Sequence, residues 1–248
     1  MENWQQWLHD LLRLEEFSVN RCSKPSGFGD ASSCELHHLS DASQVGYGAV
    51  TYRRLVNESS QIHCTFVMSK ARVVPLKKIT IPRLELSAAT VSVRLDKMIK
   101  RELILAVDRS FFWTDSTSVL KYVANSHTRF HTFHTNRLSQ IHDCSSPSQW
   151  KYVPSKLNPA DDASRGLKVD ELLTNSSLKV STPFLWQSED KWPSYPGVEE
   201  LSEADPEDKK DAEVGGVLTD GDAVQVDQLL ERFSSWHSHK KFVAWFLR

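Results

Sequence analysis

The order in which strand and helix patterns follow one another most restricts the fold of this 248-residue chain. Between residues 35 and 69, three stretches alternate apolar and polar side chains and are joined by short loops, which predicts an antiparallel meander. A run with helical periodicity follows at residues 80–103, where Thr80 can cap the helix and Pro82 suits its first turn. The sequence therefore predicts three strands followed by one long helix.

The segment RSFFWTDSTSVLKYVAN (residues 109–125) then predicts a central strand, because its first part is apolar on both faces. Ser116 and Thr117 mark the start of a helix directly after it. A second helical stretch near residues 135–143, the strand WKYVP, and a helix starting near Asn158 and Pro159 complete the pattern. The predicted class is α/β, a mixed five-stranded sheet in the order βββαβααβα, flanked by helices.

The domain limits follow from changes in composition along the chain. A short amphipathic helix opens it, and the last part is acidic and poor in apolar residues, which is typical of a disordered linker. The predicted parts are a lead-in helix and linker (1–33), the main domain (34–168), an aromatic and proline-rich extension (169–197), an acidic linker (198–226) and a C-terminal helix (227–248).

Charge is unevenly distributed, although the net charge is only −2, which argues against a general nucleic-acid coat protein. Residues 51–101 hold eleven Lys and Arg against three acids, whereas residues 199–213 hold eight acids against two lysines. The basic part, including Lys77, Lys78 and Arg83, could contact phosphates beside an active site. A solvated charged surface explains the same residues equally well.

The sequence also indicates where the protein acts. Its four cysteines are widely spaced, without a CxxC pair, and the N-terminus shows no signal peptide. No apolar run approaches the ~20 residues needed to cross a bilayer. We therefore expect a soluble intracellular protein, in the cytoplasm or nucleus, with no membrane partner.

Four acidic positions fall where strands end or helices begin. Asp41 follows the first strand, Glu85 lies in the first turn of the long helix, and Asp115 ends the central strand. Asp161 or Asp162 opens the last helix. Each could be a simple turn or helix-start acid, but converging carboxylates in a cleft need cations, and oxygen ligands favour Mg²⁺ or Mn²⁺. Two such ions about 3.5–4 Å apart can activate water and stabilise the leaving oxygen of a phosphodiester.

The helix register distinguishes the two adjacent aspartates. If Asn158 is the N-cap and Pro159 the first helical residue, Asp161 is the third helical residue. It then borders the side of this helix that we expect to be buried. Asp162 is turned a further ~100° toward solvent. We therefore predict that Asp161 is the functional acid.

Other chemistries fit less well. His127, His131 and His134 with Cys144 suggest a zinc site, but the paired spacing of zinc ligands is missing and aromatic neighbours favour packing. An aspartic protease would need an Asp-Ser/Thr-Gly triplet, and none is present. The pair ADD lacks the surrounding sequence of a polymerase, and an integrase would carry its glutamate third rather than second.

Five blocks of the sequence closely resemble the ribonuclease H region of BEL/Pao-type long-terminal-repeat retrotransposons, a region often labelled Pao retrotransposon peptidase. The blocks are LSDASQVGYGAVTYRR, SKARVVPLKKITIPRLELSAA, FFWTDSTSVL, FHTNRLSQI and YVPSKLNPADDASRG. The resemblance spans about residues 4–195, from WQQWL to TPFLWQSEDKWP. The tail LLERFSSWHSHKKFVAWFLR resembles the segment that precedes the integrase in such polyproteins.

The resemblance implies an RNase H-like fold and two-ion cleavage of the RNA strand of RNA–DNA hybrids. Asp41, Glu85, Asp115 and Asp161 fall on the family's four acidic positions, with Asp41 bridging the ions. Two departures are His134, where the family tends to be apolar, and the lack of a clear histidine before Asp161. The implied partners are the hybrid and the reverse transcriptase and integrase parts of a parent polyprotein, which this chain does not include. The alternative function is a catalytically silent remnant that only binds nucleic acid or acts as a scaffold.

Overall fold

The computed structural model describes most of the chain up to residue 195. The described ranges are residues 2–19, 24–102, 106–125, 130–174 and 181–195. The chain divides into two units, Met1–Asp208 and Lys209–Arg248, and all described residues belong to the first. The predicted acidic linker and C-terminal helix therefore lie outside the described residues.

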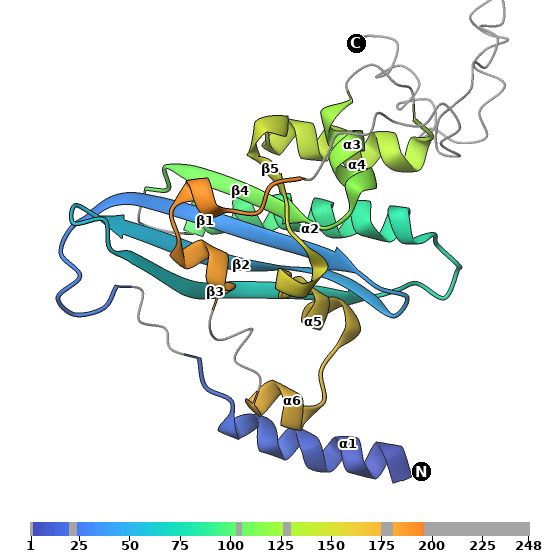
Figure 1. Cartoon of the computed structure of the whole chain (residues 1–248). Coiled ribbons are helices and arrows are strands. Elements are labelled where there is room, and N and C mark those ends of the chain that lie inside the picture. The colour runs from blue at the N-terminus through green and yellow to red at the C-terminus, as the bar shows by residue number, and fades with distance from the viewer. Residues whose placement is uncertain (1, 20–23, 103–105, 126–129, 175–180, 196–248) are drawn as a thin grey trace, which may run out of the picture. The chain divides into compact units, whose positions relative to one another are not determined.

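A five-stranded mixed sheet forms the centre of the fold (Figure 1). Its strands are β1 (Ala31–Ala42), β2 (Gly46–Asn57), β3 (Ile62–Val73), β4 (Arg109–Thr114) and β5 (Trp150–Tyr152). They are arranged in the order β3-β2-β1-β4-β5. The first three pair antiparallel, while β4 lies parallel to both β1 and β5. This arrangement confirms the predicted sheet and meander.

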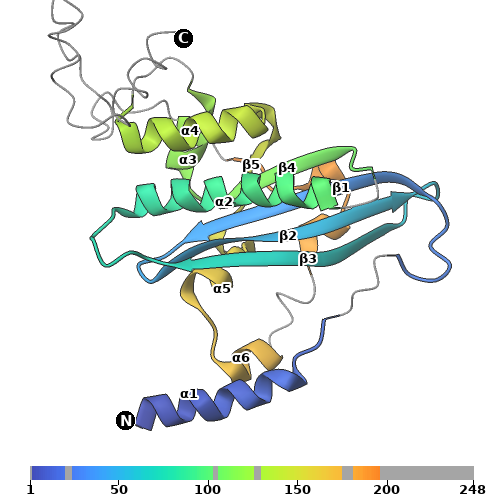
Figure 2. The same cartoon turned by 180° about the vertical axis from the view of Figure 1, so that it is seen from behind.

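Three helices cover one face of the sheet (Figures 1 and 2). They are α2 (Ile81–Glu102), α3 (Thr117–Ala124) and α4 (Thr132–Cys144). The buried face of α2 includes Leu86, Ala89 and Val93, which enter the core with residues of α3 and α4. With the short helix α5 (Ala160–Arg165), the order βββαβααβα is confirmed.

The opposite face is covered by the chain after residue 180, in two short 3-10 helices, η4 (Pro183–Trp186) and η5 (Glu189–Lys191) (Figure 1). Phe184, Leu185 and Trp192 are buried against Trp113 of β4. Arg54 Nε donates a hydrogen bond to the Leu185 carbonyl at 2.9 Å. Much of the predicted extension is therefore built into the core of the domain.

A buried ionic network supports this contact. Glu35 of β1 accepts hydrogen bonds from Arg54 and Arg109, and Arg109 also pairs with Glu189. Burial opposes the charge on Glu35, but the hydrogen bonds from His37 and Arg109 and the charge of Arg54 lower its pKa to about 2. Glu35 thus remains ionised and ties β1, β2 and β4 to the segment that covers them.

Five further helices complete the described part of the chain. They are α1 (Glu2–Arg13), η1 (Leu14–Glu16), η2 (Pro147–Gln149), η3 (Ser155–Leu157) and α6 (Val169–Thr174). Arg13 pairs with Asp170 at 2.6 Å, which joins the end of α1 to α6. Within the described ranges, every helix is too short or too polar to span a bilayer.

Candidate metal centre

Three carboxylates from different parts of the sequence converge at one edge of the sheet. Asp41 lies near the end of β1, Glu85 in α2, and Asp115 directly after β4, and their ligating oxygen atoms all lie within 4.8 Å of one another. Ser40 pairs with Thr114 across the parallel strands β1 and β4. The residues that follow this pair therefore emerge side by side, which explains how Asp41 and Asp115 meet.

Packing at the start of α2 brings Glu85 to the same place. Leu84 and Ala88 pack against Ala42 at the end of β1. The Ala42 backbone also hydrogen-bonds the Glu85 carboxylate. The helix is thus held against the strand end that carries Asp41.

The site disfavours the simultaneous ionisation of its carboxylates. Burial raises the pKa of Glu85 to about 9, and the charges of Asp41 and Asp115 add to this shift. Burial likewise raises the pKa of Asp41 to about 6, against the hydrogen bond from Ser164, and nearby Asp115 and Asp161 raise it further. A bound cation would offset the negative charges of these carboxylates and thereby favour their ionised forms.

The carboxylates fit a divalent cation. Among the described residues, Glu85 Oε2 and Asp115 Oδ1 are buried without a hydrogen-bond partner. Ser155 donates a hydrogen bond to the other oxygen of Asp115, and Ser164 donates one to Asp41. Partnerless buried carboxylate oxygens are costly, and a set of hard oxygen ligands favours Mg²⁺ or Mn²⁺. The residues could therefore hold either ion.

Asp161 lies beside this group without joining it. Its Oδ1 accepts a hydrogen bond from Arg165 Nε at 2.6 Å, and its side chain is 37% exposed. Ala160 N donates a hydrogen bond to Asn158 Oδ1 at 3.2 Å, but α5 begins at Ala160 with Pro159 in the N-cap position, one residue later than predicted. Asp161 acts on the pKa of Asp41, whereas Asp162 raises that of the buried Tyr52. The two adjacent aspartates thus influence different parts of the domain.

The carboxylates border an open hollow of about 280 Å³. The lining residues come from the starts of α2 and α3: Ile81, Pro82, Glu85, Asp115, Ser116, Thr117 and Ser118. Ser116 caps α3 through a hydrogen bond from Val119 N to its hydroxyl group. The hollow gives a substrate direct access to two of the three carboxylates.

The three basic residues predicted to bind phosphates lie shortly before Glu85 in the sequence. Two of them are exposed, and the third contacts an aromatic ring. Lys77 and Lys78 are exposed in the loop before α2. The guanidinium carbon of Arg83 lies 5.3 Å from the centre of the Phe133 ring in α4. Arg137 approaches the same ring to 3.5 Å. Thus Phe133 is placed between α2 and α4 in contact with two guanidinium groups.

Arg137 is a candidate functional residue that the sequence reasoning missed. Its Nε donates a hydrogen bond to Ser87 Oγ at 3.0 Å, which links α4 to α2. Burial lowers the pKa of Arg137, and the charges of Arg94 and Arg83 lower it further. The spacing of four residues between Phe133 and Arg137 was the available signal, although Phe133 precedes the helix predicted near residues 135–143.

The histidines show no zinc arrangement within the described ranges. His134 is fully buried and contacts the rings of Tyr122, Phe130 and Phe133. Among the described residues, the group that could hold a metal ion is the acidic one, Asp41, Glu85 and Asp115. His127 lies outside the described residues.

Comparison with solved structures gives several ribonucleases H. One is the N-terminal RNase H domain of rv2228c from Mycobacterium tuberculosis, solved as a fusion with maltose-binding protein: 14% identity, 54% of this chain and 95% of that chain covered, TM-score 0.35. Another is RNase H1 from Halobacterium salinarum NRC-1, which is 12% identical, with 57% of this chain and 98% of that chain covered and a TM-score of 0.35. A third is LC11-RNase H1, isolated from compost and solved with an RNA/DNA hybrid. It is 10% identical, with 56% of this chain and 99% of that chain covered and a TM-score of 0.37.

Sequence comparison gives one family. The search of curated proteins gave no match. Residues 1–116 match the family model of the Pao retrotransposon-like RNaseH-like domain, a region that contains Asp41, Glu85 and Asp115. The mixed five-stranded sheet and its flanking helices agree with that description. The chain therefore has an RNase H-like fold, and its residues 1–116, just under half of the chain, are similar to the Pao retrotransposon-like RNaseH-like domain.

Proposed function

We propose that this chain is a retroelement-derived ribonuclease H of the BEL/Pao type, a metal-dependent endoribonuclease that hydrolyses the RNA strand of RNA–DNA hybrids. One observation carries the proposal: three carboxylates lie within 4.8 Å at the edge of an RNase H-like sheet. Two of them have buried oxygens without a hydrogen-bond partner in the described structure. Such a group suits metal-assisted phosphodiester hydrolysis.

Asp41, Glu85, Asp115 and Asp161 would hold two Mg²⁺ or Mn²⁺ ions. When bound, the ions would activate water and stabilise the leaving oxygen. Ser155 and Ser164 orient the carboxylates of Asp115 and Asp41.

To bind a metal ion, the Asp161 side chain would have to leave Arg165 and turn toward the other three carboxylates. Its partial exposure makes this a side-chain movement on the surface of α5.

The basic residues near α2 would bind the nucleic-acid backbone. Lys77 and Lys78 are exposed, and Arg83 shares the Phe133 ring with Arg137. Contacts of this kind position a duplex without reading its sequence. Selection of the hybrid would come from 2′-hydroxyl contacts and groove shape. The reverse transcriptase and integrase parts of a parent polyprotein would be further partners.

The second candidate function is a silent remnant that binds nucleic acid or acts as a scaffold. The ion pair of Asp161 with Arg165 favours it, because this pair holds the fourth carboxylate outside the group of three. The deciding experiment measures binding and cleavage of an RNA–DNA hybrid together. Cleavage that requires Mg²⁺ supports the nuclease, whereas binding without cleavage in Mg²⁺ and in Mn²⁺ supports the scaffold.

A further inference from the structure

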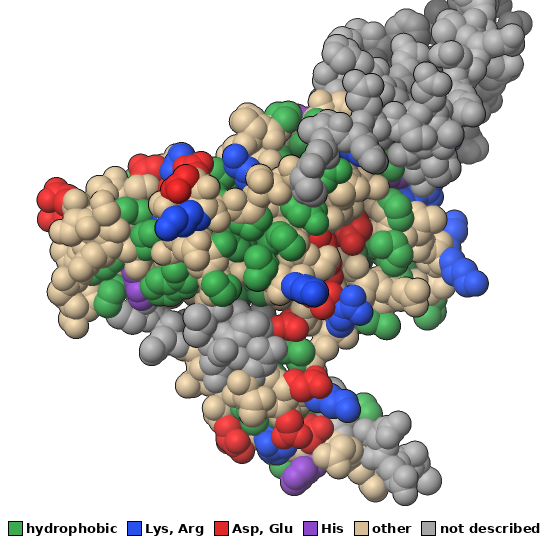
Figure 3. All heavy atoms as spheres, viewed as in Figure 1, with side chains coloured by type: hydrophobic (Ala, Val, Ile, Leu, Met, Phe, Trp, Pro, Cys, Tyr) green, Lys and Arg blue, Asp and Glu red, His purple; other side chains and the backbone are tan. Residues whose placement is uncertain are grey.

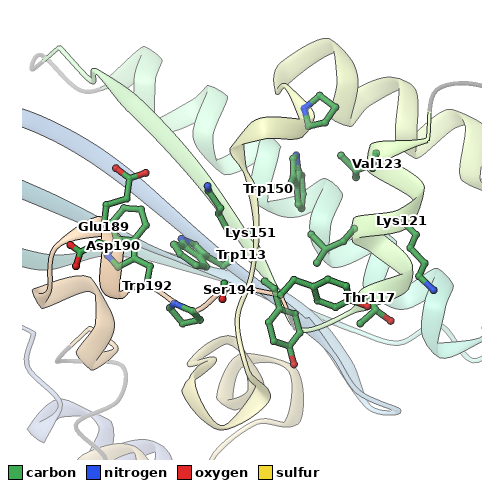
Figure 4. Close-up of a pocket in the computed structure, with 16 residues that line it drawn as sticks. Trp113, Thr117, Lys121, Val123, Trp150, Lys151, Glu189, Asp190, Trp192 and Ser194 are labelled. Atoms are coloured by element: carbon green, nitrogen blue, oxygen red, sulfur yellow. The ribbon is translucent and has the colours of Figure 1, made fainter. Parts of the chain in front are cut away.

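A second pocket, of about 510 Å³, lies between α3, β5 and residues 189–195 (Figure 4). Its apolar wall is mainly aromatic, formed by Trp113, Trp150, Tyr152, Trp192 and Tyr195. Figure 4 shows Trp113, Trp192 and Lys151 on one side, facing Thr117 of α3 on the other. Apolar pockets of this size with a few polar groups are typical small-ligand sites.

The segment after residue 180 supplies one wall of this pocket and is held firmly. Arg54 donates hydrogen bonds to the carbonyl groups of Leu185 and Gln187, and its guanidinium group lies 5.4 Å from the Trp192 ring centre. The rings of Tyr152 and Tyr195 meet at 5.4 Å between centres. The aromatic wall is therefore a fixed part of the fold.

The pocket adjoins the metal centre. Thr117 lines both this pocket and the hollow beside Glu85 and Asp115. Tyr152 pairs with Thr114, the residue before Asp115, and Ser155 hydrogen-bonds Asp115. Figure 3 shows an apolar patch next to acidic side chains on this face. A chain lying across the carboxylates can thus reach the pocket.

The lining combines aromatic rings with groups suited to a nucleotide. Lys151 lines the pocket and can complement a phosphate, whereas Lys121 extends from α3 away from the aromatic rings in Figure 4. Two carboxylates also line the pocket, Asp190 and Glu189, and Glu189 pairs with Arg109. Ser194 and Asp190 offer oxygen acceptors for the amino groups of a base. Stacking on aromatic side chains and contact with basic groups are how proteins hold single-stranded nucleic acid.

We propose that this pocket binds the base of an unpaired nucleotide that continues from a hybrid lying at the metal centre. The inference rests on the proposed function and extends it, since the favoured substrate becomes a hybrid with a single-stranded end. An aromatic or aliphatic side chain of a protein partner would fill the same space, but it would make no use of Lys151.

The test compares the affinity of the full chain for two hybrids by fluorescence anisotropy in EDTA, where metal-dependent cleavage cannot occur. One hybrid has blunt ends and the other carries a short single-stranded overhang. The overhang should tighten binding by about tenfold, the effect of one stacked base. Equal affinity for the two hybrids would overturn the pocket assignment and leave the proposed nuclease standing. Failure to bind either hybrid in EDTA would also overturn the pocket assignment, and the cleavage assay in Mg²⁺ decides the nuclease separately.

Two variants and a matched control locate the effect. Tyr195→Ala removes a ring and Lys151→Glu reverses a charge at the wall, so each should reduce the preference for the overhang while affinity for the blunt hybrid changes less. Lys191 is exposed and lies outside the lining, so Lys191→Glu should keep the preference. Thermal unfolding identifies any variant that fails to fold. A preference retained by both folded pocket variants, or abolished equally in the control, would refute the assignment.

Discussion

The Ser164 hydroxyl group of α5 donates a hydrogen bond to Asp41 Oδ2 near the end of β1, across 123 residues of sequence. The same hydroxyl group contacts the Asp161 carbonyl at 3.0 Å. Ser164 is therefore a positioning residue that couples the helix of the fourth acid to the group of three carboxylates.

Replacing Ser164 with Ala should weaken Mg²⁺ binding by about 10–100-fold, the usual effect of removing a residue that orients a metal ligand. The pKa of Asp41 should also rise, because the hydrogen bond from Ser164 lowers it. The acidic limb of the activity profile should consequently move to higher pH. Mg²⁺ titrations of cleavage at several pH values measure both effects, with Ser59→Ala in the exposed β2–β3 turn as control. An unchanged Mg²⁺ requirement would show that Ser164 does not position Asp41.

Asp161→Asn should abolish most metal-dependent cleavage, whereas Asp162→Asn should leave the rate within a few-fold of normal. The reason is that Asp161 is the acid that we propose joins Asp41 at the metal centre, whereas Asp162 acts on the pKa of the buried Tyr52. Single-turnover cleavage of a hybrid compares the two variants, which carry the same chemical change at adjacent positions. The reverse order would place Asp162 in the site, and two active variants would mean that three carboxylates suffice.

Glu85→Gln should stabilise the metal-free protein at pH 7 by about 0.5–2 kcal/mol while removing activity. The folded-state pKa of Glu85, about 9, lies above its ordinary value of 4.5, so the folded protein binds more protons between these values. The stability of the parent in EDTA should accordingly fall as pH rises from about 4.5 to 9. Urea unfolding across this range measures the slope, which the variant should reduce. A variant less stable than the parent at pH 7 would contradict the electrostatic account.

Neutralising Lys77 and Lys78 together should weaken hybrid binding and reduce its salt dependence. For each phosphate that a lysine no longer neutralises, the slope of log affinity against log salt should fall in magnitude by about 0.9. Affinity measured over a range of salt concentrations provides the slope, and Lys24→Gln, beside Asp30 in the lead-in, is the control. An unchanged slope would assign both lysines to a solvated surface.

The sequence was sufficient to predict how the three carboxylates meet, because parallel strands end at one sheet edge and helix periodicity fixes where Glu85 lies. The helix register allowed the contact of Asp161 with Arg165, which lies four residues later, but whether Asp161 takes Arg165 or a metal ion as its partner depends on side-chain conformation. The contact of Arg83 with the Phe133 ring was hidden, since it requires α4 to pack on α2. The aromatic pocket depends on Arg54 holding a segment 131 residues away, a distance over which periodicity carries no information.

The most direct measurement of the central claim is strand-specific cleavage of an RNA–DNA hybrid by the full chain and by Asp115→Asn, each in Mg²⁺ and in EDTA. Asp115→Asn removes one carboxylate of the group while keeping the size of the side chain. We predict that the parent cuts the RNA strand in Mg²⁺ alone, leaves the DNA strand and duplex DNA intact, and loses this activity in Asp115→Asn. RNA cleavage in EDTA, equal cutting of duplex DNA, or full activity in a folded Asp115→Asn chain would contradict the account.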